Sequence, residues 1–196
     1  TAGALIASTA DASPLVTPGQ PVPGFTGTNS NGDTVSLADF SGRTVVLEWT
    51  NDGCPFVQKH YATPPANMQT LQSYAGADDV IWLSVISSAP GKQGHVTGDE
   101  ANSLTAVRDA MPSHVLLDET GEIGHLYGAK TTPHMYVISP DGTLAYEGAI
   151  DSTPSARVED IAEATNYVRA ALDSVAAGEA VAVPSSKPYG CSVKYE

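Results

Sequence analysis

The stretch that decides the fold runs from residue 44 to residue 57 and reads Thr44-Val45-Val46-Leu47-Glu48-Trp49-Thr50-Asn51-Asp52-Gly53-Cys54-Pro55-Phe56-Val57. Its first seven residues are mostly apolar, β-branched or aromatic, which is typical of a buried strand. After a short loop, Cys54 and Pro55 begin a helix, because a proline in the first helical turn costs little. The pattern predicts a strand that turns sharply into a helix, with a thiol at the turn.

Further strands and helices alternate along the chain on both sides of this stretch. Residues 25–37 predict a small hairpin, because the turn at 29–33 is rich in Asn, Gly and Asp. Buried strands are expected at 80–86, 114–118 and 134–138, with 144–147 pairing back antiparallel. Helices are expected at 55–74 with a break at Pro64-Pro65, at 99–110 and at 154–177. This order predicts an α/β fold with a mixed central sheet flanked by helices.

The chain length fits one domain with a tail at each end. Of the 196 residues, 41% are hydrophobic, which is enough for a single packed core. We expect an N-terminal tail at 1–20, one domain at 21–178, and an extended C-terminal tail at 179–196 that carries Cys191. The net charge of −13 repels phosphate groups, so neither nucleic acid nor an anionic membrane surface is an expected partner.

The first twelve residues are small and weakly apolar. Ala10-Asp11-Ala12 fits the small-x-small pattern at which a secretory signal is cleaved, so we expect an exported, periplasmic or secreted protein. A simple N-terminal tail is the alternative interpretation. The chain has two cysteines, Cys54 and Cys191, and an even number in an exported protein is compatible with a disulfide.

Four segments resemble the thioredoxin-like superfamily. Residues 49–57 sit where those proteins carry their strand–Cys-x-x-Cys–helix motif. Residues 131–138, with Thr132-Pro133, resemble their Thr-Pro strand, whose proline is cis. Residues 139–142 resemble the Asp-Pro-x-Gly hairpin of the redoxin, or AhpC/TSA, branch. The terminus Tyr189-Gly190-Cys191-Ser192-Val193-Lys194-Tyr195 resembles that of a peroxiredoxin-like subgroup, which shares the Cys-Pro-aromatic-Val motif.

The resemblance implies a thioredoxin-like fold with an N-terminal β-hairpin extension and an extended C-terminal tail. It also implies a thiol-dependent oxidoreductase or peroxiredoxin-like antioxidant protein that needs an external thiol reductant and no organic cofactor. Val57 replaces the second motif cysteine, and Thr50 precedes Cys54 by four residues rather than three. We therefore rank disulfide exchange slightly above peroxide reduction.

Cys54 is the candidate nucleophile. An ordinary cysteine is mostly protonated at neutral pH, whereas the unpaired N–H groups at a helix start favour the thiolate. The alternative is an inert buried cysteine. By the resemblance, Thr132 and Pro133 lie against the sulfur and bind substrate together with Pro55. An ordinary loop proline is the alternative for Pro133.

Three other titratable residues are candidates. Glu48 precedes Cys54 by six residues, where thioredoxin keeps a buried acid that moves protons for the thiol. The alternative is a strand-edge glutamate facing solvent. His134 follows Pro133 and His60 lies in the predicted helix after Cys54. Either could favour the thiolate, or bind copper or zinc together with Cys54, and His134 is also a candidate for substrate binding.

Cys191 has three interpretations. It resolves an oxidised Cys54 as a second cysteine, it forms a permanent structural disulfide with Cys54, or it serves another molecule. A resolving Cys191 would make the protein an oxidoreductase that acts on a protein disulfide or a peroxide. A permanent disulfide would make it a structural or regulatory redoxin domain. A Sco-like copper-binding metallochaperone is a further alternative. The oligomeric state stays open.

Overall fold

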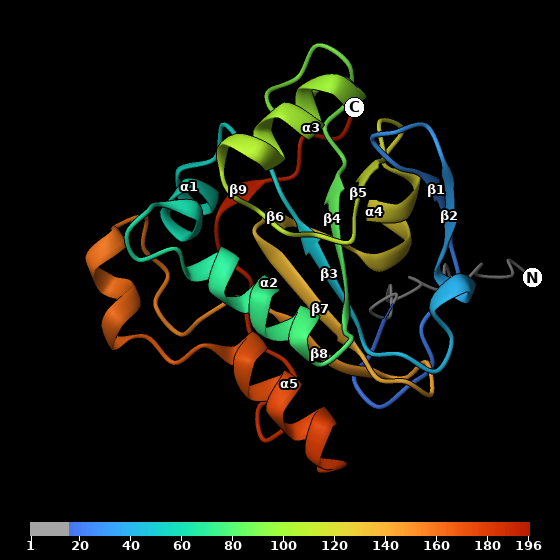
Figure 1. The fold of residues 1–196 in the computed structure, drawn as a ribbon, viewed down its shortest axis with the longest axis vertical. Coiled ribbons are helices and arrows are strands. Elements are labelled where there is room, and N and C mark those ends of the chain that lie inside the picture. The colour runs from blue at the N-terminus through green and yellow to red at the C-terminus, as the bar shows by residue number, and fades with distance from the viewer. Residues whose placement is uncertain (1–15) are drawn as a thin grey trace, which may run out of the picture.

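The computed structural model describes residues 16–196, which form a five-stranded sheet covered on both faces (Figure 1). The expected cleavage site at residues 10–12 lies outside the described residues. The sheet order is β5-β4-β3-β7-β8. Its strands are β3 (Val45–Trp49), β4 (Ile81–Ile86), β5 (His114–Leu117), β7 (His134–Ile138) and β8 (Leu144–Gly148). Strands β3, β4 and β5 are parallel, whereas β7 runs antiparallel to β3 and β8. The mixed sheet confirms the predicted α/β fold class.

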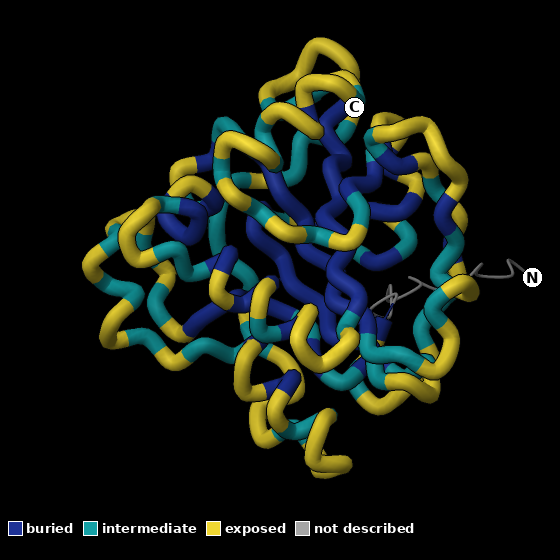
Figure 2. The backbone as a smooth tube through the Cα atoms, in the orientation of Figure 1, coloured by how far each residue is buried: buried dark blue, intermediate teal, exposed yellow. Residues whose placement is uncertain are grey.

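Alternation along the strands sends apolar side chains to both faces of the sheet. On one face Val46 packs with α1 (Pro55–Tyr61), α2 (Asn67–Ala77) and α5 (Tyr167–Ala177). On the other face Leu47 packs with the N-terminal extension and α4 (Glu122–Tyr127). The extension consists of β1 (Thr26–Thr28), β2 (Thr34–Ser36) and the 3-10 turn η1 (Leu37–Phe40). Figure 2 shows the central strands as the most continuous buried part of the chain.

Helix α3 (Gly98–Val107) covers the end of the sheet beyond β4 and β5. Thr97 caps it: the hydroxyl accepts from the Glu100 backbone, and the Glu100 carboxylate accepts from the Thr97 backbone. Ala101 packs against Ile86 and Val115. Helix α3 therefore packs beside the C-terminal end of β4.

The predicted helix at 154–177 is wrong over its first half. Residues Val158–Glu163 form a 3-10 turn, η2, and α5 begins only after Asn166, whose side chain accepts a hydrogen bond from the Arg169 amide. The break occurs because Thr165 exchanges hydrogen bonds with Ser152. These bonds hold the backbone extended before α5. The helical spacing of apolar residues therefore extends over a segment that does not form an α-helix.

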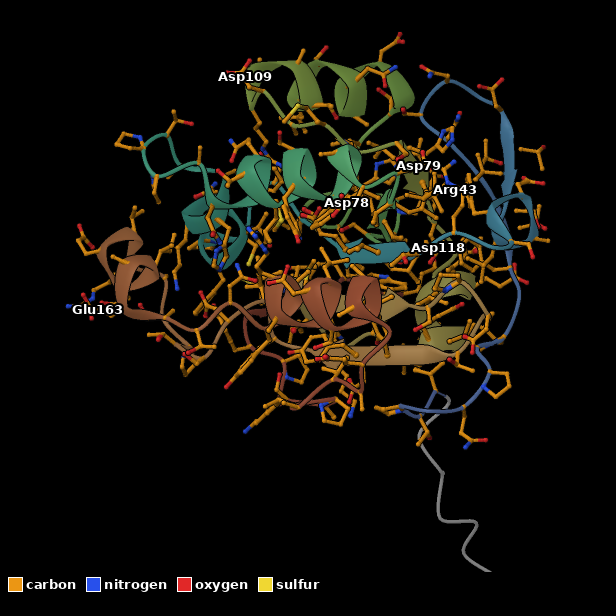
Figure 3. The ribbon with its side chains drawn as sticks, turned by 60° about the horizontal axis from the view of Figure 1, so that its bottom comes forward. Arg43, Asp78, Asp79, Asp109, Asp118 and Glu163 are labelled. Carbon is orange, nitrogen blue, oxygen red and sulfur yellow. The ribbon has the colours of Figure 1, made fainter. Side chains whose placement is uncertain are left out.

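Within residues 16–196, several acidic side chains form ion pairs at the surface. Figure 3 shows Arg43 beside Asp79 at the end of α2, and the two side chains are 2.5 Å apart. Asp79 is 84% exposed, so this pair contributes little to stability. Within residues 16–196, no helix combines the length and the apolar character needed to cross a bilayer.

The C-terminal tail (179–196) lies against the body of the protein. Its strand β9 (Cys191–Ser192) pairs antiparallel with β6 (Thr131–Thr132), directly before β7. In Figure 1 this red segment lies beside β6 and close to α1. The tail thereby carries Cys191 to the part of the fold where β3 turns into α1.

Candidate functional site

Cys54 is the residue that caps the start of α1. Asn51 shapes the turn before it: the side-chain oxygen accepts a hydrogen bond from the Gly53 amide at 2.9 Å, and the carbonyl accepts from the Cys54 amide at 3.1 Å. Pro55 then occupies the first helical turn, as predicted. Cys54 has no exposed surface. The turn therefore fixes the sulfur at the inner end of the helix.

Three segments that are distant in the sequence meet at this sulfur. The Thr132–Pro133 peptide bond is cis, and the Cys54 thiol donates to the Thr132 carbonyl at 3.1 Å. Cys191 pairs with Thr132 in the β6–β9 ladder, and its Sγ lies 2.7 Å from Cys54 Sγ. Both cysteines are free thiols in this structure. The fold therefore places the two sulfurs within reach of a disulfide bond.

Gly190 permits this close approach of the tail. Its φ of +135° is in a region that residues with a side chain avoid, and a Cβ there would lie 2.0 Å from the Thr132 carbonyl oxygen. No flexible side chain could move aside, because the obstructing atom belongs to the backbone. The tail therefore passes over Thr132 only with a glycine before Cys191.

The two thiols differ in acidity. Burial raises the pKa of the Cys54 thiol, but hydrogen bonds to the sulfur, led by that from Cys191, outweigh it and hold this pKa below its usual value. Burial, together with the contact to Cys54, raises the pKa of Cys191 to about 11. Because the thiolate is the reactive form of a cysteine, Cys54 is the more readily ionised of the two sulfurs.

Glu48 is fully buried in the central strand β3, so the interpretation as a solvent-facing residue is wrong. Its carboxylate accepts hydrogen bonds from Tyr61 at 2.8 Å, Trp82 at 2.8 Å and Ser84 at 3.0 Å. Burial raises its pKa, and these three donors offset the rise in part. A carboxyl with a raised pKa can exchange a proton nearer neutral pH.

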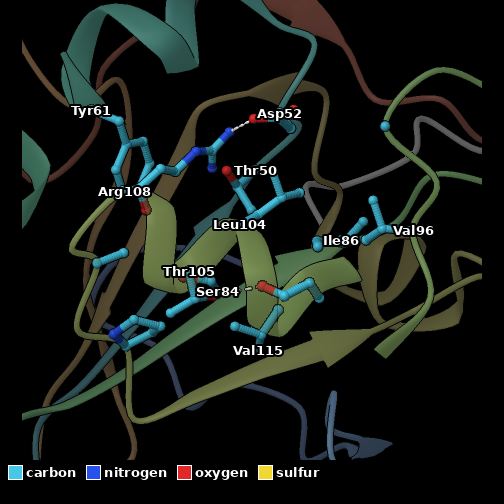
Figure 4. Close-up of a pocket in the computed structure, with 14 residues that line it drawn as sticks. Thr50, Asp52, Tyr61, Ser84, Ile86, Val96, Leu104, Thr105, Arg108 and Val115 are labelled. Atoms are coloured by element: carbon cyan, nitrogen blue, oxygen red, sulfur yellow. Dashed lines mark hydrogen bonds and ion pairs between the residues drawn. The ribbon is translucent and has the colours of Figure 1, made fainter. Parts of the chain in front are cut away.

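A small cavity of about 30 Å³ adjoins the partners of Glu48. Tyr61 and Ser84 line it, and Figure 4 shows Arg108 reaching across it to pair with Asp52. The buried Thr50 hydroxyl also lines it and has no hydrogen-bond partner. The volume, and the hydroxyl groups of Thr50, Tyr61 and Ser84 within an otherwise largely apolar lining, suit one water molecule.

Neither candidate histidine is placed at the cysteines. His134 is directed to Glu147, 3.3 Å away, and contacts Tyr136 and the Lys130 amide. His60 contacts Asn67 and Tyr189. Across residues 16–196, no three His, Cys, Asp or Glu side chains gather in a way that could hold a metal ion. The geometry therefore gives the metallochaperone hypothesis no support.

Several residues around the tail were not predicted from the sequence. Tyr189 and Tyr195 hold the tail on either side of Cys191, and Asp151 and Lys59 meet Tyr189 in the interior. Tyr189 and Tyr195 belong to the terminal motif, which was the available signal. No sequence pattern indicates that Lys59 and Asp151 are buried, because their burial follows from packing between distant segments.

Comparisons with known proteins agree with this fold. The structure of an uncharacterized conserved protein from Geobacillus kaustophilus is 26% identical, with a TM-score of 0.75, and the match covers 92% of this chain and 93% of that one. A hypothetical protein from Sinorhizobium meliloti 1021 is 19% identical, with a TM-score of 0.76, over 92% and 96%. A putative thiol:disulfide interchange protein DsbE from Chlorobium tepidum is 22% identical, with a TM-score of 0.51, over 67% and 84%.

The curated proteins gave no match. Among protein families, residues 18–147 match the AhpC/TSA family. This match spans the hairpin, the turn at Cys54, the cis-proline strand and most of β8. The thioredoxin-like arrangement of these elements and the family match agree, and the chain therefore belongs to the AhpC/TSA family of redoxins.

Proposed function

We propose that this redoxin is a thiol oxidoreductase in which Cys54 is the nucleophile and Cys191 the resolving cysteine. The observation that carries the proposal is the distance of 2.7 Å between the two sulfurs, across 137 positions of sequence. The acidity of the two thiols gives the order of events, because Cys54 ionises before Cys191. Neither sulfur needs a cofactor for this chemistry.

The reaction proceeds by two exchanges. The Cys54 thiolate attacks one sulfur of a substrate disulfide, which forms a mixed disulfide and releases the first substrate thiolate. Cys191, losing its proton, then attacks Cys54 and releases the second substrate thiol. The substrate gains two electrons and two protons, and the protein is left with a Cys54–Cys191 disulfide. An external dithiol restores both thiols and is itself oxidised.

Disulfide exchange suits the surroundings of Cys54 better than peroxide reduction does. The Cys54 sulfur contacts the Thr132 carbonyl and the Cys191 side chain. β9 of the tail occupies the edge of β6 at Thr132, and an extended substrate chain could pair there in its place once the tail has moved away. Within residues 16–196, no arginine is hydrogen-bonded to Cys54. With a peroxide, Cys54 would instead become a sulfenic acid, and Cys191 would condense with it to release water.

Glu48 serves as the proton reservoir of this proposal. Its raised pKa favours a carboxyl that can take up and return protons as the thiols ionise. Pro55, Thr132 and Pro133 form the surface on which the substrate chain lies. We assign the His134 side chain no direct role, because its ring is held by Glu147.

We also propose that the protein acts outside the cytosol, where disulfide substrates persist. One structure with the same fold is described as the exposed lipoprotein thioredoxin Etrx1 of Streptococcus pneumoniae, at 21% identity and a TM-score of 0.51. The composition of residues 1–12 agrees with export. Detection of the natural protein in a periplasmic or culture fraction tests this proposal, and recovery only with cytosolic markers would contradict it.

Mass mapping of the two cysteines tests the reaction. The reduced protein is treated with one equivalent of oxidised glutathione or of hydrogen peroxide and digested without reductant. We expect a peptide pair joined through Cys54 and Cys191, and a trapped Cys54–glutathione adduct in Cys191→Ser. Faster oxidation by the disulfide supports exchange over peroxide reduction. A pair that never forms would overturn the resolving mechanism, and one that resists dithiothreitol in the folded protein would indicate a structural disulfide.

A further inference from the structure

Two residues before Cys191, the side chain of Tyr189 enters a pocket of buried charged groups. The pocket consists of Phe56, Lys59, His60 and Asp151, and we call it the Tyr189 pocket. Lys59, His60 and Asp151 are 2%, 0% and 3% exposed, although such residues normally stay at the surface unless they are paired. None of them contacts either sulfur, so the reaction proposed above does not account for their burial.

The hydroxyl of Tyr189 joins a hydrogen-bond chain with one direction. Asn67 donates to His60 Nδ1 at 2.8 Å, which leaves the proton of the neutral ring on Nε2. Nε2 lies 3.2 Å from the Tyr189 hydroxyl, which donates to Asp151 Oδ1 at 2.6 Å. Burial lowers the pKa of His60 to about 4, in agreement with a neutral ring. Each group therefore finds a partner of the opposite kind.

Asp151 depends on Tyr189 for one of its few donors. Its Oδ1 also accepts from the Thr153 amide at 3.0 Å, whereas Oδ2 has no hydrogen bond and lies 3.7 Å from the Lys59 ammonium. A buried carboxylate is costly unless such partners surround it. Loss of the tyrosine hydroxyl would leave this acceptor less satisfied.

The tyrosine ring packs directly beside the reactive turn. It meets Phe56 edge-on, with the ring centres 5.9 Å apart, and Lys59 lies over its face at 5.6 Å. Phe56 is the second residue of the helix that Cys54 caps. One wall of the pocket, Phe56, therefore lies in the helical turn that Cys54 caps, and a tail held in the pocket is held close to Cys54.

A second attachment lies on the other side of Cys191. Tyr195 donates to the Ala129 carbonyl at 2.9 Å and stacks on His125 at 4.0 Å. Cys191 is thus held between two tyrosines, and the tail covers Cys54, which has no exposed surface. A substrate disulfide can reach Cys54 only when this part of the tail lifts.

We propose that the Tyr189 pocket is a recognition site for the chain's own C-terminal tail, and that Tyr189 is a positioning residue that sets how often Cys54 is uncovered and how effectively Cys191 returns to it. This inference rests on the proposed function, because it concerns the delivery of the resolving cysteine. The ligand of the pocket is a phenol, recognised by a carboxylate acceptor, a neutral imidazole donor and an aromatic wall.

Removal of one oxygen tests the inference in the full chain. In reduced Tyr189→Phe, we expect the rate at which iodoacetamide modifies Cys54, followed by peptide mass mapping, to rise about tenfold or more, since a hydrogen bond to a charged acceptor is lost. We expect the equilibrium constant of the Cys54–Cys191 disulfide against glutathione to fall by a similar factor. Tyr167→Phe is the matched control, because no hydrogen bond of the Tyr167 hydroxyl occurs in the described part of the chain, and it should change neither quantity.

The outcomes separate this inference from the proposed function. If wild type forms the disulfide and Tyr189→Phe matches wild type in both measurements, the recognition site is refuted and the resolving mechanism stands. If wild type never forms the disulfide, the resolving mechanism fails, but the alkylation rates still decide whether Tyr189 holds the tail over Cys54. A melting temperature close to that of wild type shows that the phenylalanine variant is folded.

Discussion

Replacement of Gly190 by alanine should move Cys191 away from Cys54. The added Cβ would lie 2.0 Å from the Thr132 carbonyl oxygen and 2.8 Å from its carbon, so the tail backbone must move. The φ of +135° adds a conformational cost of about 1–3 kcal/mol for a residue with a side chain. Converted to an equilibrium, this cost alone lowers the formation of the Cys54–Cys191 disulfide by about 5-fold to 140-fold.

Equilibration with defined ratios of reduced and oxidised glutathione measures this effect. The fractions of protein disulfide and free thiol are counted after acid quenching and alkylation. Gly142→Ala is the matched control, because Gly142 also has a positive φ of +82° but nothing lies within 4 Å of its added Cβ. Control and wild type should share one equilibrium constant. If Gly190→Ala also matches them, the close passage of the tail over Thr132 does not determine the pairing, and the reasoning is refuted.

Three further predictions follow from buried groups. Glu48→Gln should slow oxidation of Cys54 by about 100-fold, measured by stopped flow. Because folding raises the pKa of Glu48, the free energy of unfolding of wild type falls as pH rises through that pKa, whereas glutamine does not titrate. In urea titrations, the free energy of unfolding of the variant minus that of wild type should therefore be larger at pH 8 than at pH 4. Cys54→Ala should lower the pKa of Cys191 from about 11 toward its usual value, seen in the pH dependence of alkylation, because the neighbouring sulfur no longer opposes ionisation. Leu47→Ala should cost about 2–5 kcal/mol in denaturant unfolding, because Leu47 is fully buried; a smaller loss would place it outside the core.

Local sequence patterns were sufficient for the centre of the fold. The apolar run before Cys54 forms β3, and Pro55 opens α1, because both depend on neighbouring residues alone. The helix expected from residue 154 is wrong over its first half, because hydrogen bonds between Thr165 and Ser152 tie this segment to the loop after β8, and the apolar pattern of the segment does not show them. Non-local hydrogen bonds thus overrode a local apolar pattern.

The candidate site was predictable where one motif contained it. Glu48 was a candidate from its spacing to Cys54, but its burial among Trp82 and Ser84 depends on β4, which pairs beside β3. The meeting of Cys54 with Cys191 depends on where the tail runs, and no spacing along the chain determines that. The sequence makes His60 a candidate neighbour of the sulfur, whereas in the structure it contacts Asn67 and Tyr189, because position in a helix does not specify which segment packs over it.

The long span between the two sulfurs links the redox state to resistance against denaturation. A bond between Cys54 and Cys191 would close a loop across 137 positions, which includes four of the five strands of the central sheet. In the chain-entropy account, a loop of this size restricts the unfolded ensemble by about 5 kcal/mol. By thermodynamic linkage, reduction of this bond would be less favourable in the folded protein than in the unfolded chain by the same free energy. The form with the disulfide would therefore resist denaturation better than the form with two thiols, and the stability of the protein would change with its redox state.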